Sequence, residues 1–583
     1  MIYEIKATVL KNQKMGPAVY QMKLECPEVA KEAKPGQFIT VKCEEGILLW
    51  RPFSIAGVEE GRFISLFYKT VGPGTEWLAQ AQEGDILDLR GPLGGNGFTI
   101  NSEIKNSILV AGGIGIAPLI FLSRSLCSLG NPEPLFLIGA KDGFSIIWPP
   151  LEYKIAGVRI ATEDGSLGYR GTVTELLENT LSAKQLPADT RMIYAVGPRP
   201  MLKVVAEIAK EHQIPCEVSL ETIMACGVGA CLGCAISTTS GNQRVCKDGP
   251  VFDAAKVVWD KYVPQRKILD TTITSPATSP IEKTKNVDLA VNIGGIELKN
   301  PVMPASGTFG YGEEFTNLVN LNTLGAIITK GITLEPRDGA DQPRLCEIPQ
   351  GMINRIGLQN PGVKKFIAEK MPFLRTLKLP VIVNICGSTV EEYQKLAKIL
   401  DTVEGIAAVE INISCPNTKE GGMLFGQDPR LAFKVVSAVR KTTSLPIITK
   451  LTPAVTSIVQ IAEAAVKAGT NALSAINTMP ALSFVNGQIM LGGQSGPSIR
   501  PIALRFIYEL ARAKLGVPLI GCGGIMTWQD VVEFLMVGAQ AVEIGTATFT
   551  NLKAMEEVIQ GLENYLQKQG IKDINEIIGT ALS

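Results

Sequence analysis

Four cysteines within one short stretch have the spacing of a metal-cluster site. Cys226, Cys231, Cys234 and Cys246 are arranged as C-x4-C-x2-C-x11-C within ACGVGACLGCAISTTSGNQRVCKDG. Four thiolates can hold a [2Fe–2S] cluster, and C-x4-C-x2-C followed by a distal cysteine is the plant-type ferredoxin spacing. A structural zinc site is the alternative, but such sites favour two C-x2-4-C pairs, and only one is present. The spacing therefore predicts a [2Fe–2S] cluster on these four residues.

A fifth cysteine lies in a polar cluster that directly follows an apolar run. The run ends in NISCPN, which places Cys415 between Asn412 and Asn417. Because His212 is the only histidine, a multi-histidine metal site is excluded and a Ser-His-Asp triad is possible only around that residue. Cys415 is therefore the candidate acid–base or nucleophilic group, and the glycine-bearing TKEGGMLFGQDP behind it could close as a lid. The alternative is an inert packed thiol, the role that we expect for the other seven cysteines.

Eight short apolar runs recur over the C-terminal part, most of them separated by helical patterns such as VEEYQKLAKIL. This rhythm within about 300 residues predicts a (β/α)8 barrel, in which the carboxyl ends of the strands carry the chemistry. Polar residues or glycines stand at that end of nearly every run. The runs begin at Asn300 (NPVMPAS), Gly325 (GAIITKG), Leu379 (LPVIVNICG), Ala407 (AAVEINISCPN), Leu445 (LPIITKLTP), Ala472 (ALSAINT), Val517 (VPLIGCGGI) and Ala541 (AVEIGTATF).

Two lysines lie inside these apolar runs, in IITKG (Lys330) and IITKL (Lys450). A lysine among buried neighbours is costly unless an anion pairs with it, although an exposed lysine is the commoner case. We expect a reduced flavin or a substrate carboxylate to supply that charge. Gly523-Gly524 and Gly545-Thr546 end the last two runs, where such barrels commonly bind phosphate.

The N-terminal part has a different pattern. Alternating strands with Gly/Pro turns predict a small antiparallel barrel over residues 1–100, and alternating strands and helices predict an open α/β sheet over 101–215. Residues 216–263 form the cluster module, and 264–286, rich in Thr, Ser and Pro, form a linker. The barrel domain then covers residues 287–583. The predicted class is a multidomain α/β protein.

Composition limits the function classes. The 583 residues include 56 basic and 56 acidic side chains, so the formal net charge is zero. This balance argues against non-specific nucleic-acid binding. The N-terminus lacks a signal-peptide pattern, and the longest uncharged apolar stretch, Ile108 to Leu122, is too short to span a bilayer. We therefore expect a cytoplasmic protein with reduced thiols and no membrane partner.

Three N-terminal motifs precede the cysteines: RPFS at Arg51, GGIG at Gly112 and VGPRPM at Val196. In this order they resemble the ferredoxin-reductase-like family, and more closely the electron-transfer subunit of NAD-dependent dihydroorotate dehydrogenases. The resemblance implies FAD in the first barrel and NAD across the second lobe. No clear basic pair for a 2′-phosphate stands out in the sequence, which favours NAD over NADP. The implied FAD residues are Arg51, Pro52, Phe53, Ser54, Phe67, Tyr68, Lys69, Gly74 and Thr75. The chain departs from the family where Val196 replaces a usual cysteine and where GPLGGNGF carries an additional glycine.

The barrel motifs PVMPASGTFGYGEEF, ITKGITLEPR, GMINRIGLQNPG, NISCPN, INT and GCGGI resemble the catalytic subunit of class 1 dihydroorotate dehydrogenases. The cysteine in NISCPN resembles the soluble class, and the attached FAD and cluster part resembles the NAD-linked subclass, here fused. The implied FMN residues are Ser306, Lys330, Gly331, Asn384, Asn412, Lys450, Ile476, Gly496, Gly523, Gly524, Gly545 and Thr546. The implied substrate residues are Lys330, Asn354, Arg355, Ile356, Gly357, Leu358, Asn412, Asn477 and Thr478.

This resemblance implies an oxidoreductase that oxidises dihydroorotate to orotate in pyrimidine biosynthesis. Electrons would pass from FMN through [2Fe–2S] and FAD to NAD+, with Cys415 as base, Lys450 stabilising the reduced flavin and Lys330 binding the carboxylate or a flavin oxygen. The resemblance also suggests a homodimer formed through the barrel domain. Two alternatives stay open: a dihydropyrimidine dehydrogenase acting on uracil or thymine with the same cofactors, and a non-catalytic redox sensor.

Overall fold

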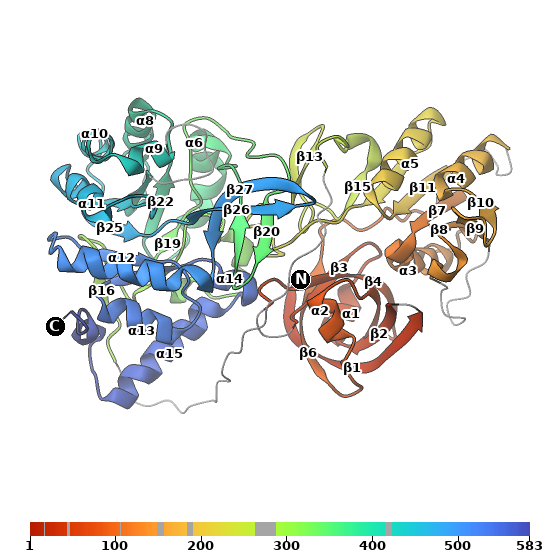
Figure 1. Cartoon of the computed structure of the whole chain (residues 1–583), viewed down its shortest axis with the longest axis horizontal. Helices are drawn as coiled ribbons and strands as arrows, with labels where there is room; N and C mark the ends of the chain where they lie inside the picture. The colour runs from red at the N-terminus through yellow and green to blue at the C-terminus, as the bar shows by residue number, and fades with distance from the viewer. Residues whose placement is uncertain are drawn as a thin grey trace. The chain divides into compact units, whose positions relative to one another are not determined.

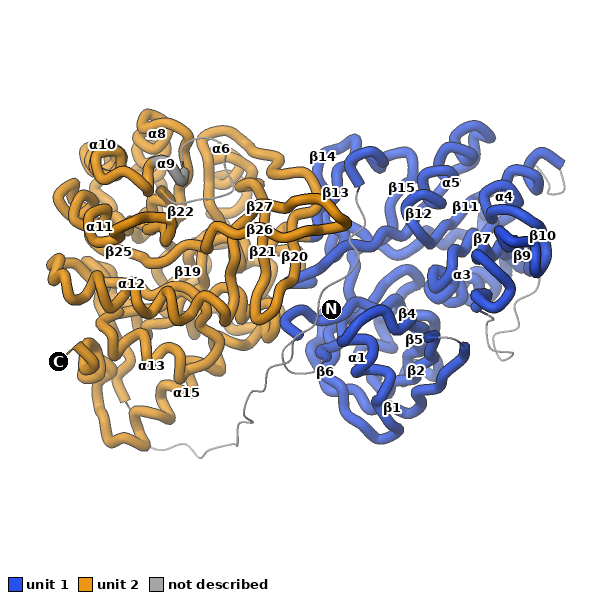
Figure 2. The backbone as a smooth tube through the Cα atoms, viewed as in Figure 1, with its two compact units in different colours: residues 1–227, 234–270 blue, residues 228–233, 271–583 orange. Residues whose placement is uncertain are grey.

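The structure is a computed structural model that describes residues 1–16, 18–43, 47–104, 106–147, 157–183, 191–262, 287–413 and 422–582. The chain divides into two compact units (Figure 2). Unit 1 comprises residues 1–227 and 234–270, and unit 2 comprises residues 228–233 and 271–583. The predicted linker, 264–286, lies outside the described residues, and the five-part domain division stays a prediction.

Unit 1 begins with a closed antiparallel barrel in the order β1-β2-β5-β4-β3-β6 (Figure 1). Its interior is filled by alternating apolar side chains such as Val9, Met22, Ile55 and Leu89, all fully buried. This confirms the antiparallel barrel expected from the strand alternation. The elements are β1 (Tyr3–Gly16), β2 (Val19–Glu25), α1 (Pro27–Glu32), β3 (Phe38–Val41), β4 (Arg51–Glu59), β5 (Phe63–Lys69), α2 (Pro73–Leu78) and β6 (Ile86–Leu93).

A seven-stranded sheet follows in unit 1, in the order β10-β9-β8-β7-β11-β12-β15. Its pairings are parallel except β12–β15, and three helices accompany it. The strand order reverses between β7 and β11, because the chain adds strands on one side of β7 before returning to the other side. The elements are β7 (Asn106–Gly112), α3 (Ile116–Ser128), β8 (Leu135–Ala140), β9 (Val158–Thr162), β10 (Tyr169–Arg170), α4 (Val173–Ser182), β11 (Arg191–Val196), α5 (Arg199–Glu211), β12 (Cys216–Ser219) and β15 (Val251–Asp253). A hairpin of β13 (Ala235–Thr238) and β14 (Gly241–Arg244) lies between the last two strands in sequence.

Unit 2 is built on an eight-stranded parallel sheet in the order β18-β29-β28-β25-β24-β23-β22-β19. The sheet closes where Gly325, just before β19, donates its backbone N–H to the Val302 carbonyl of β18 at 2.9 Å. The predicted (β/α)8 barrel is confirmed, and each of the eight apolar runs contains one strand. The strands are β18 (Val302–Pro304), β19 (Ile327–Ile328), β22 (Val381–Ile385), β23 (Ala408–Asn412), β24 (Ile447–Lys450), β25 (Ala472–Ala475), β28 (Leu519–Cys522) and β29 (Ala541–Ile544).

Helices surround this barrel (Figure 1), and several begin at a side chain that caps free backbone N–H groups. Thr389 accepts from Glu392 N at the start of α8, and Thr527 forms a capping box with Asp530 at the start of α13. These caps fix where each helix begins after a strand. The helices are α6 (Gly362–Lys365), α7 (Met371–Leu374), α8 (Val390–Leu400), α9 (Gly422–Gln427), α10 (Pro429–Arg440), α11 (Ile458–Lys467), α12 (Arg500–Arg512), α13 (Trp528–Met536), α14 (Ala547–Thr550) and α15 (Ala554–Gln569).

A small antiparallel sheet in the order β20-β21-β27-β26 is inserted into the barrel. Its strands are β20 (Leu345–Ile348), β21 (Gly351–Asn354), β26 (Met479–Val485) and β27 (Gln488–Ser495). The turn of the β26–β27 hairpin contains Asn486-Gly487, a dipeptide typical of tight hairpins. Sequence analysis did not predict this sheet, although the Asn-Gly pair between alternating apolar residues was a usable signal.

Within the described ranges, no helix combines the length and the apolar character that crossing a membrane requires.

Candidate active site

A cavity lies at the carboxyl ends of the barrel strands of unit 2. Including the part that opens to solvent, it measures about 1200 Å³. Its wall contains Lys330 after β19, Asn412 at the end of β23 and Lys450 at the end of β24. Every residue that the sequence assigned to FMN lines this cavity, and so do Asn354, Ile356, Leu358, Asn477 and Thr478 of the substrate set. The fold therefore gathers segments from across about 240 residues of sequence into one wall.

Two predicted substrate residues, Arg355 and Gly357, are not among the cavity-lining residues. Arg355 instead extends to the backbone carbonyl of Asp341, at 3.3 Å from its Nη2. Asn354, the last residue of β21, and Ile356 line the cavity, while Arg355 between them does not. Cys415, the predicted base, lies outside the described residues.

Part of the cavity wall is a glycine surface that a flavin phosphate would suit. Gly523 and Gly524 have φ values of +129° and +75°, and a Cβ on Gly523 would meet the Ala503 side chain at 2.9 Å. A Cβ on Gly331 would meet Asn384 Oδ1 at 2.8 Å. Such backbone can approach a ligand closely and offers N–H groups to an anion. Together with the Lys450 ammonium group, this surface fits a phosphate-bearing flavin.

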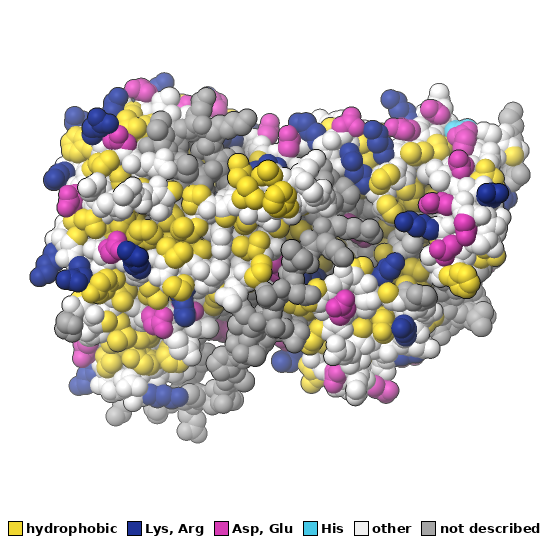
Figure 3. Space-filling view, in the orientation of Figure 1, with side chains coloured by type: hydrophobic (Ala, Val, Ile, Leu, Met, Phe, Trp, Pro, Cys, Tyr) yellow, Lys and Arg dark blue, Asp and Glu magenta, His cyan; other side chains and the backbone are white. Residues whose placement is uncertain are grey.

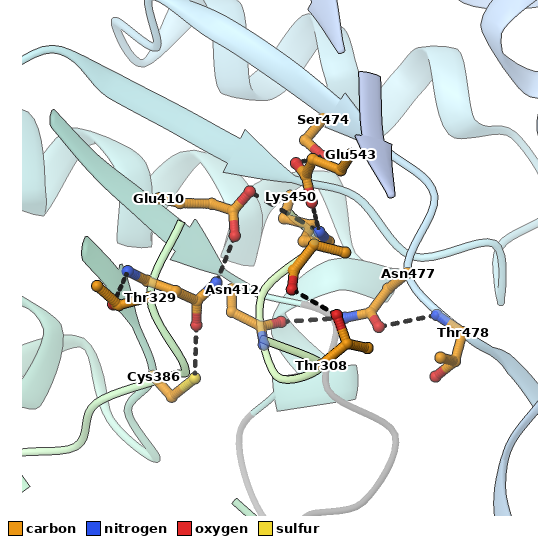
Figure 4. A network of polar contacts seen from close by, with 12 residues as sticks. Thr308, Thr329, Cys386, Glu410, Asn412, Lys450, Ser474, Asn477, Thr478 and Glu543 are labelled. Atoms are coloured by element: carbon orange, nitrogen blue, oxygen red, sulfur yellow. Dashed lines mark hydrogen bonds and ion pairs between the residues drawn. The ribbon is translucent and has the colours of Figure 1, made fainter. Parts of the chain in front are cut away.

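Two asparagines form the polar side of the cavity (Figure 4). Asn477 Nδ2 donates to Asn412 Oδ1 at 3.3 Å, and Thr478 N donates to Asn477 Oδ1 at 2.8 Å. These hydrogen bonds fix the orientation of the side-chain amide groups of Asn412 and Asn477 in the cavity wall. Paired amides of this kind can read the N–H and C=O groups of a cyclic amide substrate.

Lys450 is buried and surrounded by acidic groups of the barrel interior (Figure 4). It forms ion pairs with Glu543 on β29 and, at 3.8 Å, with Glu410 on β23. The sequence predicts that a flavin or a substrate supplies the negative charge that pairs with Lys450. That prediction is incomplete, because two glutamates of the chain also pair with it. Neither glutamate was predicted as a site residue. The available signal was the sequence Ala-Val-Glu-Ile, which occurs in both β23 and β29 and places a charged residue within an apolar run.

The predicted FAD segments of unit 1 lie on neighbouring elements. Strands β4 and β5, which carry RPFS and Phe67 to Lys69, pair antiparallel. Arg51 packs against Gly74 at the start of α2, where a Cβ on the glycine would meet Arg51 Nε at 3.0 Å. Phe53, Phe67 and Tyr68 are at most 7% exposed. Their rings therefore belong to the cores of unit 1.

The two nucleotide motifs meet at the carboxyl ends of β7 and β11. A Cβ on Gly112 would contact Met201 Sδ and Pro198 Cδ, both at 2.7 Å, and one on Gly197 would lie 3.0 Å from Gly112 Cα. This is the point where the strand order of the sheet reverses, and open α/β sheets bind their ligands at such points. The position is suited to a dinucleotide.

Three of the four cluster cysteines lie close together in unit 1. Cys234 and Cys246 are 3.2 Å apart between their Sγ atoms, and hydrogen bonds with Cys226 and Cys234 raise the pKa of the Cys246 thiol. Cys231 lies on residues 228–233, which group with unit 2. Among the described residues, no three His, Cys, Asp or Glu side chains surround a single point suited to one metal ion. Buried thiols in close contact suit a two-iron cluster, which is held by four cysteine thiolates.

Strand β6 and the loop after it hold the two cysteine segments. Arg90 Nη1 donates to the Cys226 carbonyl at 3.0 Å. Backbone N–H groups of Gly94 and Gly95 donate to the carbonyls of Cys246, at 3.2 Å, and Lys247, at 2.9 Å. The glycine pair of GPLGGNGF thus lies against the cluster segment. The additional glycine by which this chain departs from the family therefore has a structural role.

Comparison with known proteins adds to this geometry. The chain is 50% identical over 302 residues to the catalytic subunit of dihydroorotate dehydrogenase B (NAD(+)) from Geotalea uraniireducens (strain Rf4), covering 51% of this chain and 99% of that protein. The same subunit from Desulforamulus reducens is 51% identical over 302 residues, again 51% of this chain and 99% of the relative. This chain belongs to the dihydroorotate dehydrogenase family.

Two family models match separate parts of this dihydroorotate dehydrogenase family member. The dihydroorotate dehydrogenase model covers residues 288–566, and the iron-sulfur cluster binding domain of dihydroorotate dehydrogenase B covers residues 221–258. A solved structure of NADH-dependent reduced ferredoxin-NADP oxidoreductase aligns at 32% identity with a TM-score of 0.40, covering 44% of this chain and 90% of that one. The expected fusion of a cluster-bearing part to a catalytic part is confirmed.

Proposed function

We propose that this chain oxidises dihydroorotate to orotate, a step of pyrimidine biosynthesis, and delivers the electrons to NAD+. The observation that carries the proposal is the family match over the barrel, together with a cavity lined by every predicted flavin residue. The match of residues 221–258 to a cluster-binding domain supports an internal path for the electrons. A dihydropyrimidine substrate is not favoured, because the relatives are dihydroorotate dehydrogenases.

The proposed cofactors are FMN in the barrel cavity, FAD at the unit 1 barrel, a [2Fe–2S] cluster on Cys226, Cys231, Cys234 and Cys246, and NAD at the β7–β11 switch point. When bound, the flavins accept and give electron pairs, and the cluster passes single electrons between them. FAD is supported by the closed barrel in which Arg51 packs against Gly74. NAD is supported by contact of the two glycine motifs.

The protein's own residues have separate tasks in the proposed reaction. Cys415 removes the C5 proton of the substrate as a thiolate. Asn412 and Asn477 hold the ring amide groups, and the buried ammonium of Lys330 binds the substrate carboxylate or a flavin oxygen. Lys450 places a positive charge at the cavity wall, where negative charge accumulates during the reaction.

A homodimer formed through the barrel and a cytoplasmic location complete the proposal. On the β26–β27 hairpin, Leu482 faces Leu491 and Phe484 faces Ile489, and all four side chains are 49–65% exposed. Figure 3 shows hydrophobic side chains gathered over this hairpin. A contiguous exposed apolar patch is typical of an interface. Every described cysteine is a free thiol, which supports a reducing compartment.

Anaerobic titration of the full-length chain with dihydroorotate tests the substrate. We expect flavin absorbance to bleach and to recover when NAD+ is added. Dihydrouracil serves as the matched control because it lacks the carboxylate. Equal bleaching by dihydrouracil, or none by dihydroorotate, would contradict the proposal and separate an enzyme from a redox sensor.

Replacement of Cys231 by Ala tests the path of the electrons. We expect dihydroorotate still to reduce an artificial dye that accepts electrons from the barrel flavin, while reduction of NAD+ is lost. Cys127→Ala is a suitable control, since that exposed thiol lies outside the cluster motif. NAD+ reduction that survives in the Cys231 variant would show that the cluster is not on the path.

A further inference from the structure

A closed cluster of two acids and one base lies behind the cavity wall. Glu410 on β23, Lys450 on β24 and Glu543 on β29 are each at most 3% exposed. Lys450 lines the cavity, whereas the two glutamates lie behind it and are not among the lining residues. Figure 4 shows the three side chains converging from separate strands. The charge that the cavity meets at this wall is therefore the sum of the Lys450 ammonium group and the two glutamates behind it.

The two carboxylates are not equally satisfied. Glu543 accepts from Ser474 Oγ at 2.6 Å and forms the shorter ion pair with Lys450, whose Nζ lies 3.8 Å from Glu410 Oε2. Glu410 accepts from Asn384 Nδ2 at 2.5 Å through Oε1, but among the described residues its Oε2 has no hydrogen-bond partner. A buried carboxylate oxygen without a donor is costly, and protonation of Oε2 removes that cost. Glu410 is thus the acid of the pair that is suited to carry a proton.

The other titratable groups facing Glu410 keep one charge state. Burial raises the pKa of the Cys522 thiol to about 12, so it stays neutral. Burial alone would lower the pKa of Lys450, but its acidic neighbours raise it above the ordinary value, so Lys450 stays charged. Burial is the largest cause that raises the pKa of Glu410, and the charge of Glu543 is the second. Glu410 is then the variable group of this cluster.

We propose that Glu410 is a positioning residue that holds an exchangeable proton and thereby sets how much of the Lys450 charge is available to the cavity. With Glu410 neutral, Lys450 and Glu543 balance each other; with Glu410 ionised, the cluster carries a net negative charge. A negative cluster opposes the arrival of further negative charge in the cavity. This inference rests on the proposed function, because it assumes that the cavity holds a flavin.

Linkage makes this effect reciprocal. If ionised Glu410 weakens reduction in the cavity, then reduction must strengthen proton binding by Glu410. Between its pKa with the flavin oxidised and its higher pKa with the flavin reduced, Glu410 therefore binds up to one proton from solvent, forming one O–H bond, for each two electrons and one proton that the flavin receives. Below its pKa it is already protonated and takes up none. Lys450 and Cys522 keep their charge states.

A redox titration across pH tests the inference with the full-length holoenzyme and a reference dye. With one proton per electron pair, the equilibrium constant for flavin reduction changes about tenfold per pH unit; with two protons, it changes about a hundredfold. We expect the unaltered chain to pass from the first slope to the second around the pKa of Glu410. Glu410→Gln, which imitates the protonated acid, should keep the tenfold slope throughout. The FAD flavin contributes equally to both chains, so their difference reports the barrel cavity.

The control is Glu347→Gln, which alters a buried glutamate of β20 outside the cluster and should retain both slopes. A Glu410→Gln chain that still reaches the hundredfold slope would overturn the inference. If that variant does not fold, infrared difference spectra of the unaltered chain decide: above the pKa of Glu410, reduction should produce a protonated-carboxyl band that shifts in D2O. Absence of the band also overturns the inference. A chain that binds no flavin overturns the proposed function itself, and the two failures are thus distinguishable.

Discussion

Cys415 is the residue on which the proposed proton transfer depends. A single histidine, His212, is available in the chain, and it is paired with Glu178 at 3.0 Å in unit 1. The barrel must therefore use another group as its base, and a thiolate following Asn412 is the candidate from sequence. The assignment stays a prediction, because Cys415 lies outside the described residues.

Replacing Cys415 by Ala should lower dihydroorotate oxidation by about 10²–10⁴-fold, the usual contribution of a positioned base. Cys415→Ser should recover activity only at higher pH, because a hydroxyl ionises less readily than a thiol. Stopped-flow flavin reduction across pH measures both effects. FMN content is the control for folding. Near-normal reduction in the Ala variant would remove Cys415 from the mechanism.

Lys450 also has a structural task, because it neutralises a buried glutamate. Lys450→Met should leave Glu543 without its counter-ion and lower the free energy of unfolding by about 3–5 kcal/mol, as removal of one partner of a buried pair does. The double variant Lys450→Met/Glu543→Gln should regain part of this loss. Denaturant unfolding followed by barrel tryptophan fluorescence measures both. Equal stability of the single and double variants would show that Glu543 does not depend on Lys450.

The raised pKa of Glu410 predicts a pH dependence of stability. Burial raises this pKa from 4.5 to about 8, so the folded state binds the proton more tightly than the unfolded state. The contribution to stability is fully present below about 4.5 and is lost as pH rises through about 8. Thermal unfolding over this range should show a decline that Glu410→Gln reduces. An identical decline in the variant would contradict the assignment.

At the scale of elements, β6 and the loop after it connect the first barrel to the cluster segment within unit 1. Arg90 reaches the Cys226 carbonyl, and Gly94 and Gly95 reach the segment around Cys246. A Cβ on Gly95 would press against the carbonyl oxygen of Lys247. Because that obstacle is backbone, it cannot turn away as a side chain would.

Gly95→Ala should therefore cost about 1–3 kcal/mol, as overpacking typically does, and lower the iron content of the purified chain. Gly16→Ala is the matched control, since a Cβ there meets nothing within 4 Å. Iron analysis and thermal unfolding of both variants provide the comparison. Full iron occupancy in the Gly95 variant would show that this loop does not position the cluster.

The barrel strands show why element prediction succeeded in unit 2. Runs such as LPVIVNICG and LPIITKLTP are apolar without alternation, as strands covered on both faces must be. The hairpin of β26 and β27 was not predicted, because it directly follows the INT motif (Ile476 to Thr478) and interrupts the strand–helix rhythm of the barrel. Its exposed Leu482 and Phe484 make it half-solvated, which is the pattern that alternation indicates.

At the scale of the whole molecule, the hairpin patch predicts self-association. Replacing both Leu482 and Leu491, which face each other across the hairpin, by Lys should convert a dimer into a monomer. Sedimentation velocity measures the change, and unaltered flavin absorbance would confirm folding. Phe433→Lys, at another exposed apolar side chain on α10, should keep the dimer. An unaltered chain that sediments as a monomer would contradict the proposed interface.

Much of the candidate site could be predicted because its residues stand at fixed places in recognisable runs. Lys330, Asn384, Asn412 and Gly523 all lie at or near the carboxyl end of a barrel strand, and parallel strands of one barrel bring these ends to one face. Arg355 shows the limit of this reasoning. It lies inside a correctly identified segment, yet its side chain turns away from the cavity, because irregular backbone has no fixed alternation.

The sequence by itself determined the chemistry that the chain has available: a four-cysteine spacing, a scarcity of histidine, eight apolar runs and lysines within two of them. These follow from local composition and spacing, which are properties of the chain alone. Only the tertiary structure decided which charges meet. Glu410, Lys450 and Glu543 stand on three strands up to 133 residues apart, and Lys450 pairs with both glutamates because barrel closure brings those strands together. Burial then makes their protonation interdependent, and burial is a property of the folded molecule.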